Sequence, residues 1–154
     1  MAQIEVEAAD AEVIARLGQL LERSAHTEFS TTCALGFSTT IFAWIAQRVR
    51  REGEPLADTL KAKWQAVKAQ EEPWQMPAPL GDLSVFDAVV RLRRASTHAD
   101  GSRTHPQNAH GSLVGFVFDA HQVPFVVLEA DLRRFAVLVA REFSDHMRPV
   151  DANK

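Results

Sequence analysis

The sequence predicts a mainly α-helical fold, a bundle of four to five helices with a short β-hairpin before the last helix. Three observations support it. Apolar residues recur at helical spacing through most of the chain, segments containing proline or glycine separate these stretches, and strand-like runs occur only between residues 113 and 130. A chain of 154 residues has the length of one domain. We therefore expect a single domain over residues 1–154, with its core at about 13–147.

The first predicted helix covers residues 10–24. Its apolar positions recur every three or four residues and are Val13, Leu17, Leu20 and Leu21. Glu12 and Arg16 lie one turn apart on another face, where they can form an ion pair.

A second, longer helix is predicted at about 29–51, and Gly53-Glu54-Pro55 ends it. The residues that step along one side of it are Phe37, Ile41, Trp44, Ile45 and Arg48. Its first half is nearly apolar all round, which predicts burial by several neighbours or by a second subunit. Its last turns are basic, and we expect them to be solvated or to face a partner.

Residues 29–46 contain no charged side chain, and this length could span a bilayer. Six serine and threonine hydroxyls dilute the hydrophobicity of the segment, however, and a buried helix of a bundle explains it equally well. We therefore expect no membrane association. A small membrane-associated protein anchored by this segment is the remaining alternative.

The third helix is predicted at about 56–70, with Leu56, Leu60, Trp64 and Val67 inward. Residues 71–82 hold three prolines and a glycine and are predicted to form a loop, held in place by Trp74 and Met76. Asp82 or Ser84 can cap a fourth helix, whose core face is Phe86, Val89 and Val90.

Residues 99–112 are polar and predict a loop. The runs at 113–118 and from 124 onward are typical of two strands, which form a hairpin or a pair of extended arms. The last helix is predicted at about 131–147. Its inward residues are Leu132, Phe135, Val139 and Phe143.

Composition narrows the function. The formal charge of −3 argues against a surface coated for nonspecific nucleic-acid binding, so any RNA contact would be local. Cys33 is the single cysteine, which excludes an intramolecular disulfide and a cysteine metal cage. The N-terminus is acidic where a secretion signal would be basic, and we expect a cytoplasmic protein. No phosphate-binding or dinucleotide-binding glycine motif occurs, so we expect no cofactor.

The end of the fourth helix carries the strongest candidate for chemistry. Arg91, Arg93 and Arg94 crowd its last turns, and His98 follows. Arginine holds phosphate oxygens in a planar fork, and histidine can move a proton near neutral pH, so the group is equipped for metal-free chemistry on an RNA phosphodiester. Arg93 lies seven residues after Phe86, close to the buried face. A purely structural role is the alternative, because basic residues in a last turn also complement the helix dipole.

Spacing alone does not single out this group. Arginine and histidine recur at similar separation in four pairs, Arg91 with His98, Arg93 with His98, Arg103 with His110, and Arg141 with His146. Only the first two place the histidine where a buried helix opens into a polar loop. We interpret the Arg141 pair as part of a solvated helix face. A metal site made of His98, His105, His110 and Asp100 matches no standard zinc spacing.

The segment LRRASTHADG resembles the motif of HEPN domains, in which an arginine is followed by a polar residue, three further residues and a histidine, often with glycine after it. The segments AWIAQRVRRE and GSLVGFVFD extend the resemblance to a small plasmid-borne branch of that superfamily. It implies a bundle that forms a homodimer with the two motif helices facing each other.

The resemblance also implies a metal-independent endoribonuclease that would act as a toxin or defence effector, with RNA as its substrate and an antitoxin protein as a partner. His98 would transfer the proton and Arg93 would hold the phosphate, while Arg91 and Arg94 would bind RNA. Arg94 departs from the family, which usually has Asn, Asp or His there. Arg94 could bind phosphate, or it could mark a catalytically inactive module that binds RNA or a partner protein.

Overall fold

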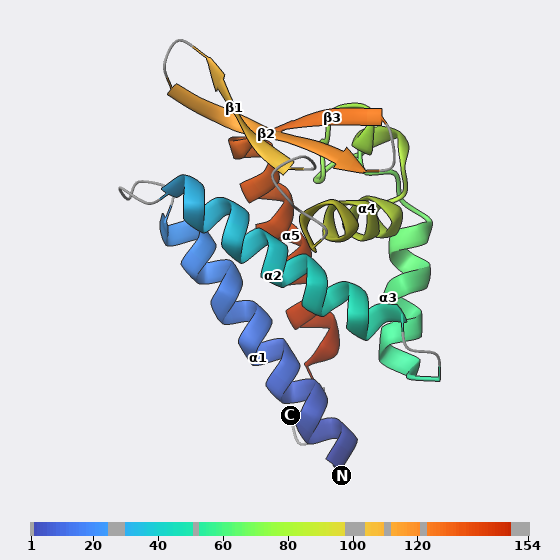
Figure 1. The fold of residues 1–154 in the computed structure, drawn as a ribbon. Helices are drawn as coiled ribbons and strands as arrows, with labels where there is room; N and C mark the ends of the chain where they lie inside the picture. Colours follow the sequence, from blue (N-terminus) through green and yellow to red (C-terminus); the bar gives the residue numbers. More distant parts are fainter. Residues whose placement is uncertain are drawn as a thin grey trace.

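The computed structural model describes residues 2–24, 30–50, 53–97, 104–109, 112–120 and 123–148. The helices are α1 (Ala2–Arg23), α2 (Ser30–Arg50), α3 (Pro55–Gln65), α4 (Val85–Thr97) and α5 (Glu129–Met147), with a short 3₁₀ turn, η2 (Leu80–Asp82). The strands are β1 (Thr104–Ala109), β2 (Ser112–Ala120) and β3 (Val123–Leu128). They form an antiparallel sheet in the order β1-β2-β3, which lies across one end of the helices and packs on α4 and α5 (Figure 1).

The predicted fold class is confirmed. The structure is mainly helical, and β2 and β3 form a hairpin that leads directly into α5. Among the described residues, no helix combines the length and the apolarity needed to cross a bilayer.

The prediction that residues 99–112 form only a loop is wrong, because β1 lies within them. Thr104 pairs with Phe118 at one end of β1, and Ala109 pairs with Ser112 at the other. The strand has a polar sequence and contains Pro106, so it lacks the alternation of apolar residues from which a strand is predicted. As an edge strand it needs hydrogen bonds on one side only, and proline is tolerated there. Pairing with the backbone of β2 therefore defines β1.

The predicted apolar face of the first helix is also wrong in part. Val13 and Leu20 are 37% and 47% exposed, whereas Ala11, Ile14 and Leu21 are fully buried. A glycine lies where α1 meets α5. A Cβ added at Gly18 would lie 3.1 Å from the Cβ of Ala140 on α5, so the two helices approach closely there. The helix also begins at Ala2, well before the predicted residue 10. The Glu12–Arg16 ion pair is present, with 3.8 Å between Arg16 Nε and Glu12 Oε1.

The second helix has the predicted extent to within one residue at each end, and Ile41 and Ile45 are buried. Arg48 contradicts the expectation of a solvated basic end. Its side chain is buried and forms ion pairs with Asp10 of α1 and Glu54. The indole Nε1 of Trp44 donates a hydrogen bond to Asp10 Oδ1 at 3.1 Å. Two carboxylates from outside the helix compensate the charge of Arg48 and allow its burial.

The third helix ends at Gln65 rather than at residue 70, because residues 67–69 pair with residues 83–85. The amide of Val85 donates to the carbonyl of Val67 at 2.9 Å, and the amide of Ala69 donates to the carbonyl of Leu83 at 2.8 Å. These bonds hold together the two ends of the loop predicted between the third and fourth helices. Trp74 and Met76 within this loop are buried, as predicted.

An aromatic cluster joins the parts of the core. The ring of Phe135 on α5 lies 5.9 Å from that of Phe42 on α2 and 5.6 Å from that of Trp74. Trp74 in turn contacts the ring of Trp64 on α3 at 6.5 Å. The four predicted inward residues of α5 are all buried. The sequence pattern of α5 therefore identified the centre of the core correctly.

Gly115 controls the packing of β2 on β3. A Cβ added there would lie 2.4 Å from the carbonyl oxygen of Val127 and 2.8 Å from the Cα of Leu128. Both are backbone atoms, so the strands would have to separate. We expect Gly115→Ala to lower the free energy of unfolding by about 1–3 kcal/mol, the usual cost of overpacking. Urea denaturation followed by circular dichroism measures it.

Gly36→Ala is the matched control for this substitution. A Cβ at Gly36 would meet no atom within 4 Å, and the residue lies inside α2. Alanine there should stabilise the protein by up to about 1 kcal/mol, because it restricts the unfolded chain and favours the helix. Equal effects of the two substitutions would contradict the assigned role of Gly115.

Candidate functional site

The helix that carries the candidate residues is α4, and its first turn is fixed by a cap. The amide of Asp87 donates to Ser84 Oγ at 3.1 Å, so Ser84 is the capping residue of the two predicted. The predicted core face, Phe86, Val89 and Val90, is buried. These contacts fix the rotation of the helix about its axis, and hence the directions in which its arginines point.

Arg91 is half-buried and lies against the sheet. Its guanidinium carbon is 4.8 Å from the ring centroid of Phe125 on β3, in a cation–π contact. The Phe125 ring is stacked on that of Phe118 at 5.5 Å. Arg91 is thus oriented by the inner face of the hairpin, so the hairpin takes part in shaping this end of α4.

Arg93 and Arg94 point in different directions. Arg93 is half-buried and its Nε atom is shielded from solvent, which agrees with the predicted position near the buried face. Arg94 is exposed. Consecutive residues of an α-helix are about 100° apart, whereas residues three apart lie on one side. Arg94 therefore faces solvent, Arg91 lies on the neighbouring side of α4 against Phe125, and Arg93 is turned towards the core.

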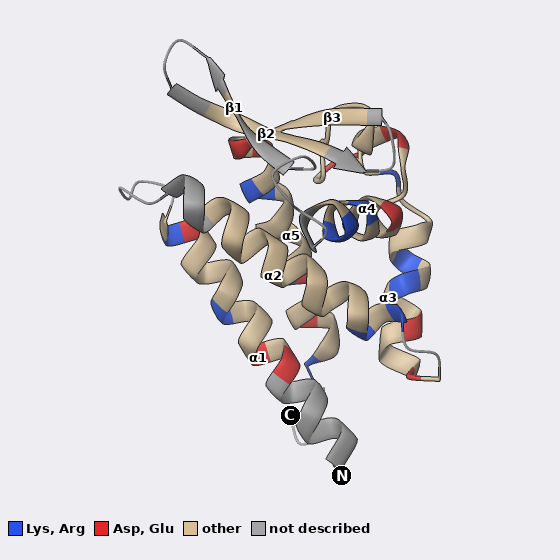
Figure 2. Ribbon diagram, viewed as in Figure 1, with Lys and Arg blue, Asp and Glu red and all other residues tan. Residues whose placement is uncertain are grey.

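Basic side chains from a second helix lie close to α4. The Nζ atom of Lys61 on α3 is 5.4 Å from the ring centroid of Phe86, near the start of α4. Figure 2 shows Lys and Arg on both α3 and α4. Sequence spacing did not place Lys61 beside α4, because the contact with Phe86 joins two helices.

His98 lies outside the described residues, as do the side chains of Ser96 and Thr97. The helix ends at Thr97, one residue before His98. The structure thus places the three arginines but not the histidine. Asp100, His110 and the side chain of His105 are likewise outside the described part, and the described residues contain no group of three or more metal-binding side chains.

Arg141 and His146, the fourth arginine–histidine pair, bind different partners. Arg141 on α5 is exposed and bonds to Glu22 of α1. His146 is half-buried, and its Nε2 lies 2.8 Å from the carbonyl oxygen of Leu56. The interpretation as a solvated face is correct for Arg141 and wrong for His146, because the start of α3 covers the imidazole.

No family model, curated protein or solved structure matches the chain. The evidence for the candidate site therefore comes from the residues of this chain alone. It offers a basic helix end with one arginine held on an aromatic ring, one exposed and one turned inward. The exposed guanidinium can bind an anion, and phosphate is an anion that matches the planar fork of arginine.

Proposed function

We propose that the protein is a metal-independent endoribonuclease of HEPN type that acts as a homodimer. The support that carries most weight is the separation of roles among the arginines of α4. Arg93, at the edge of the core, is suited to holding the reacting phosphate. Arg94 on the solvent side, and Arg91 at the edge of the sheet beside Phe125, are suited to binding the RNA backbone, which gives them a positioning role.

In the proposed reaction the ribose 2′-hydroxyl attacks the adjacent phosphorus. The 2′-oxygen loses its proton, the bond to the 5′-oxygen breaks, and that oxygen gains a proton. A 2′,3′-cyclic phosphate and a free 5′-hydroxyl result. His98 serves as the proton-transfer group, and the guanidinium of Arg93 stabilises the charge that builds up on the phosphate oxygens.

We expect the purified protein to cleave total RNA in the presence of EDTA. His98→Ala should slow cleavage by at least about a hundredfold, because loss of a general acid or base typically costs that much. His110→Ala is the matched control and should retain activity. RNA that stays intact with the wild-type protein, or is cut equally fast by the His98→Ala variant, would refute the ribonuclease proposal.

A catalytically inactive module that binds RNA or a partner protein is the second candidate, and Arg94 favours it. The side chain is exposed and cationic at a position where the resemblance calls for a residue that positions the histidine. Fluorescence anisotropy with labelled RNA distinguishes the two. RNA binding that Arg94→Gln weakens and Arg16→Gln does not, without cleavage by the wild type, would support the inactive module. A strict monomer in sedimentation would count against both candidates.

A further inference from the structure

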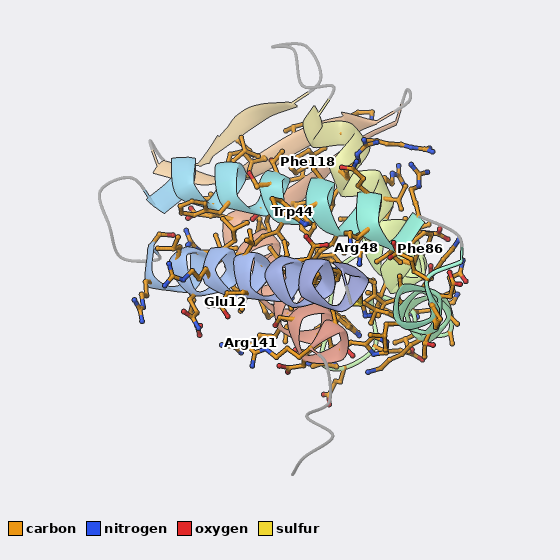
Figure 3. All side chains as sticks on the ribbon, turned by 90° about the horizontal axis from the view of Figure 1, so that it is seen from below. Glu12, Trp44, Arg48, Phe86, Phe118 and Arg141 are labelled. Carbon is orange, nitrogen blue, oxygen red and sulfur yellow. The ribbon has the colours of Figure 1, made fainter. Side chains whose placement is uncertain are left out.

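A groove on the outer side of α5 is independent of the arginines of α4. It lies between α5, the end of α1 and β2, has a volume of about 620 Å³, and takes no lining residue from α4. Its apolar lining consists of Val114, Ala130, Val137 and Leu138. This volume is in the range of small-molecule sites. Figure 3 shows Arg141, which lines the groove, on the outer side of α1 and α5 and away from Phe86 of α4.

The groove is elongated along α5. Its lining positions on α5 run from Glu129 to Arg141, which corresponds to about 18 Å at the helical rise of 1.5 Å per residue. Three arginines line it, and each is paired with a carboxylate, Arg133 with Glu129, Arg134 with Asp131 and Arg141 with Glu22. An apolar floor beside an exposed arginine fits a ligand that has an apolar body and an anionic group.

The arginines differ in how firmly they are held. Arg133 Nη1 donates to the carbonyl of Leu21 at 2.5 Å and to Ser24 Oγ at 2.7 Å, and Arg133 Nη2 bonds to Glu129. Arg133 therefore ties α5 to the end of α1 and shapes one wall. The neighbouring Arg134 is drawn away towards the loop, where its Nη2 donates to the carbonyl of Gln75 at 2.9 Å.

Arg141 is the side chain best placed to accept an anion. It is 58% exposed, and within the described part of the chain its hydrogen bonds use Nη2 alone, at 2.8 and 2.9 Å from the two carboxylate oxygens of Glu22. A guanidinium has five N–H donors, so the N–H groups of Nη1 can still donate to a second carboxylate. The Glu22 pair is exposed and holds the side chain only weakly.

We propose that this groove binds a monomeric anion with a linear apolar tail, such as a medium-chain carboxylate. The tail lies on Val114, Val137 and Leu138, and the carboxylate bonds to Arg141. The elongated shape and apolar floor select the tail, and the exposed guanidinium of Arg141 selects the head group. The proposal does not depend on ribonuclease activity.

Isothermal titration calorimetry with hexanoate, octanoate and decanoate, each below its micelle concentration, tests the proposal. We expect affinity to rise about fourfold for each added methylene that the groove buries. Arg141→Gln should weaken decanoate binding by about tenfold or more, because a hydrogen bond to a charged group is lost. Glu22→Gln should strengthen it, because a competing carboxylate disappears.

Two controls make the experiment specific. Arg16→Gln removes an exposed, paired arginine of α1 that does not line the groove, and it should leave decanoate binding unchanged. Ala130→Trp fills the groove from an exposed position and should abolish binding without affecting the fold. The proposal is overturned if decanoate does not bind, if decanol or decyltrimethylammonium binds equally well, or if Arg16→Gln weakens binding as much as Arg141→Gln.

Discussion

Arg48→Met is expected to lower the free energy of unfolding by about 3–5 kcal/mol, the cost of removing one partner of a buried ion pair. The side chain of Arg48 is only 6% exposed, and those of its partners Asp10 and Glu54 are 12% and 15% exposed. Without the guanidinium, two carboxylates remain close together and poorly solvated. The loss of this compensation, rather than the loss of packing, produces the expected effect, because methionine replaces much of the apolar stem of arginine.

Urea denaturation at neutral pH measures this change, with Arg50→Met as the matched control. Arg50 lies two residues further along α2 and is exposed, so its replacement should change stability by less than about 0.5 kcal/mol. A variant that also carries Asp10→Leu and Glu54→Leu should regain most of the lost stability, since an apolar set can replace a buried charged one. A loss below about 1 kcal/mol for Arg48→Met alone would show that water solvates the cluster.

The same cluster illustrates what the sequence could not show. The basic end of α2 is correctly visible as a run of arginines, but only the fold reveals that Arg48 points inward to meet Asp10 from a helix more than thirty residues earlier. Helical spacing assigns a residue to a face. It does not assign the partner that makes burial of a charge possible, because that partner comes from another element.

Periodicity was most informative where one face is large and apolar. The inward residues of α5 and the buried face of α4 were predicted from spacing alone, because Leu, Phe and Val contrast sharply with their polar neighbours. It was less informative for α1, where Val13 and Leu20 lie outside although Leu21 is buried, and where Gly18 approaches Ala140 of α5 closely. Close helix packing there favours small side chains, which a count of large apolar residues overlooks.

Some features of the candidate site could be predicted from the sequence, and others could not. The inward position of Arg93 followed from its spacing after Phe86, and Ser84 was among the predicted caps. The contact between Arg91 and Phe125 was not predicted, because it joins α4 to a strand more than thirty residues later. The groove on α5 was also missed. Its arginines stand in an amphipathic helix whose outer face looks ordinary until α1 and β2 enclose it.

Phe135→Ala is expected to destabilise the protein by about 3–5 kcal/mol, the usual cost of truncating a buried phenylalanine. Phe135 is fully buried, and its ring touches those of Phe42 and Trp74. It therefore holds α2, α5 and the loop after α3 in one core. The cavity would be bordered by aromatic rings that are themselves packed against other elements, so local collapse cannot fill it easily.

Phe135→Leu is the control, because it keeps an apolar side chain of intermediate volume and should cost clearly less than Phe135→Ala. Chemical denaturation gives the two free energies, and near-ultraviolet circular dichroism reports on the packing of Trp74. The alanine variant should lose part of that aromatic signal even while folded, since one face of the indole loses its neighbour. If both substitutions cost the same and leave the aromatic spectrum unchanged, Phe135 does not join these elements, and the core must be held by the contacts of Trp64 and Phe42 instead.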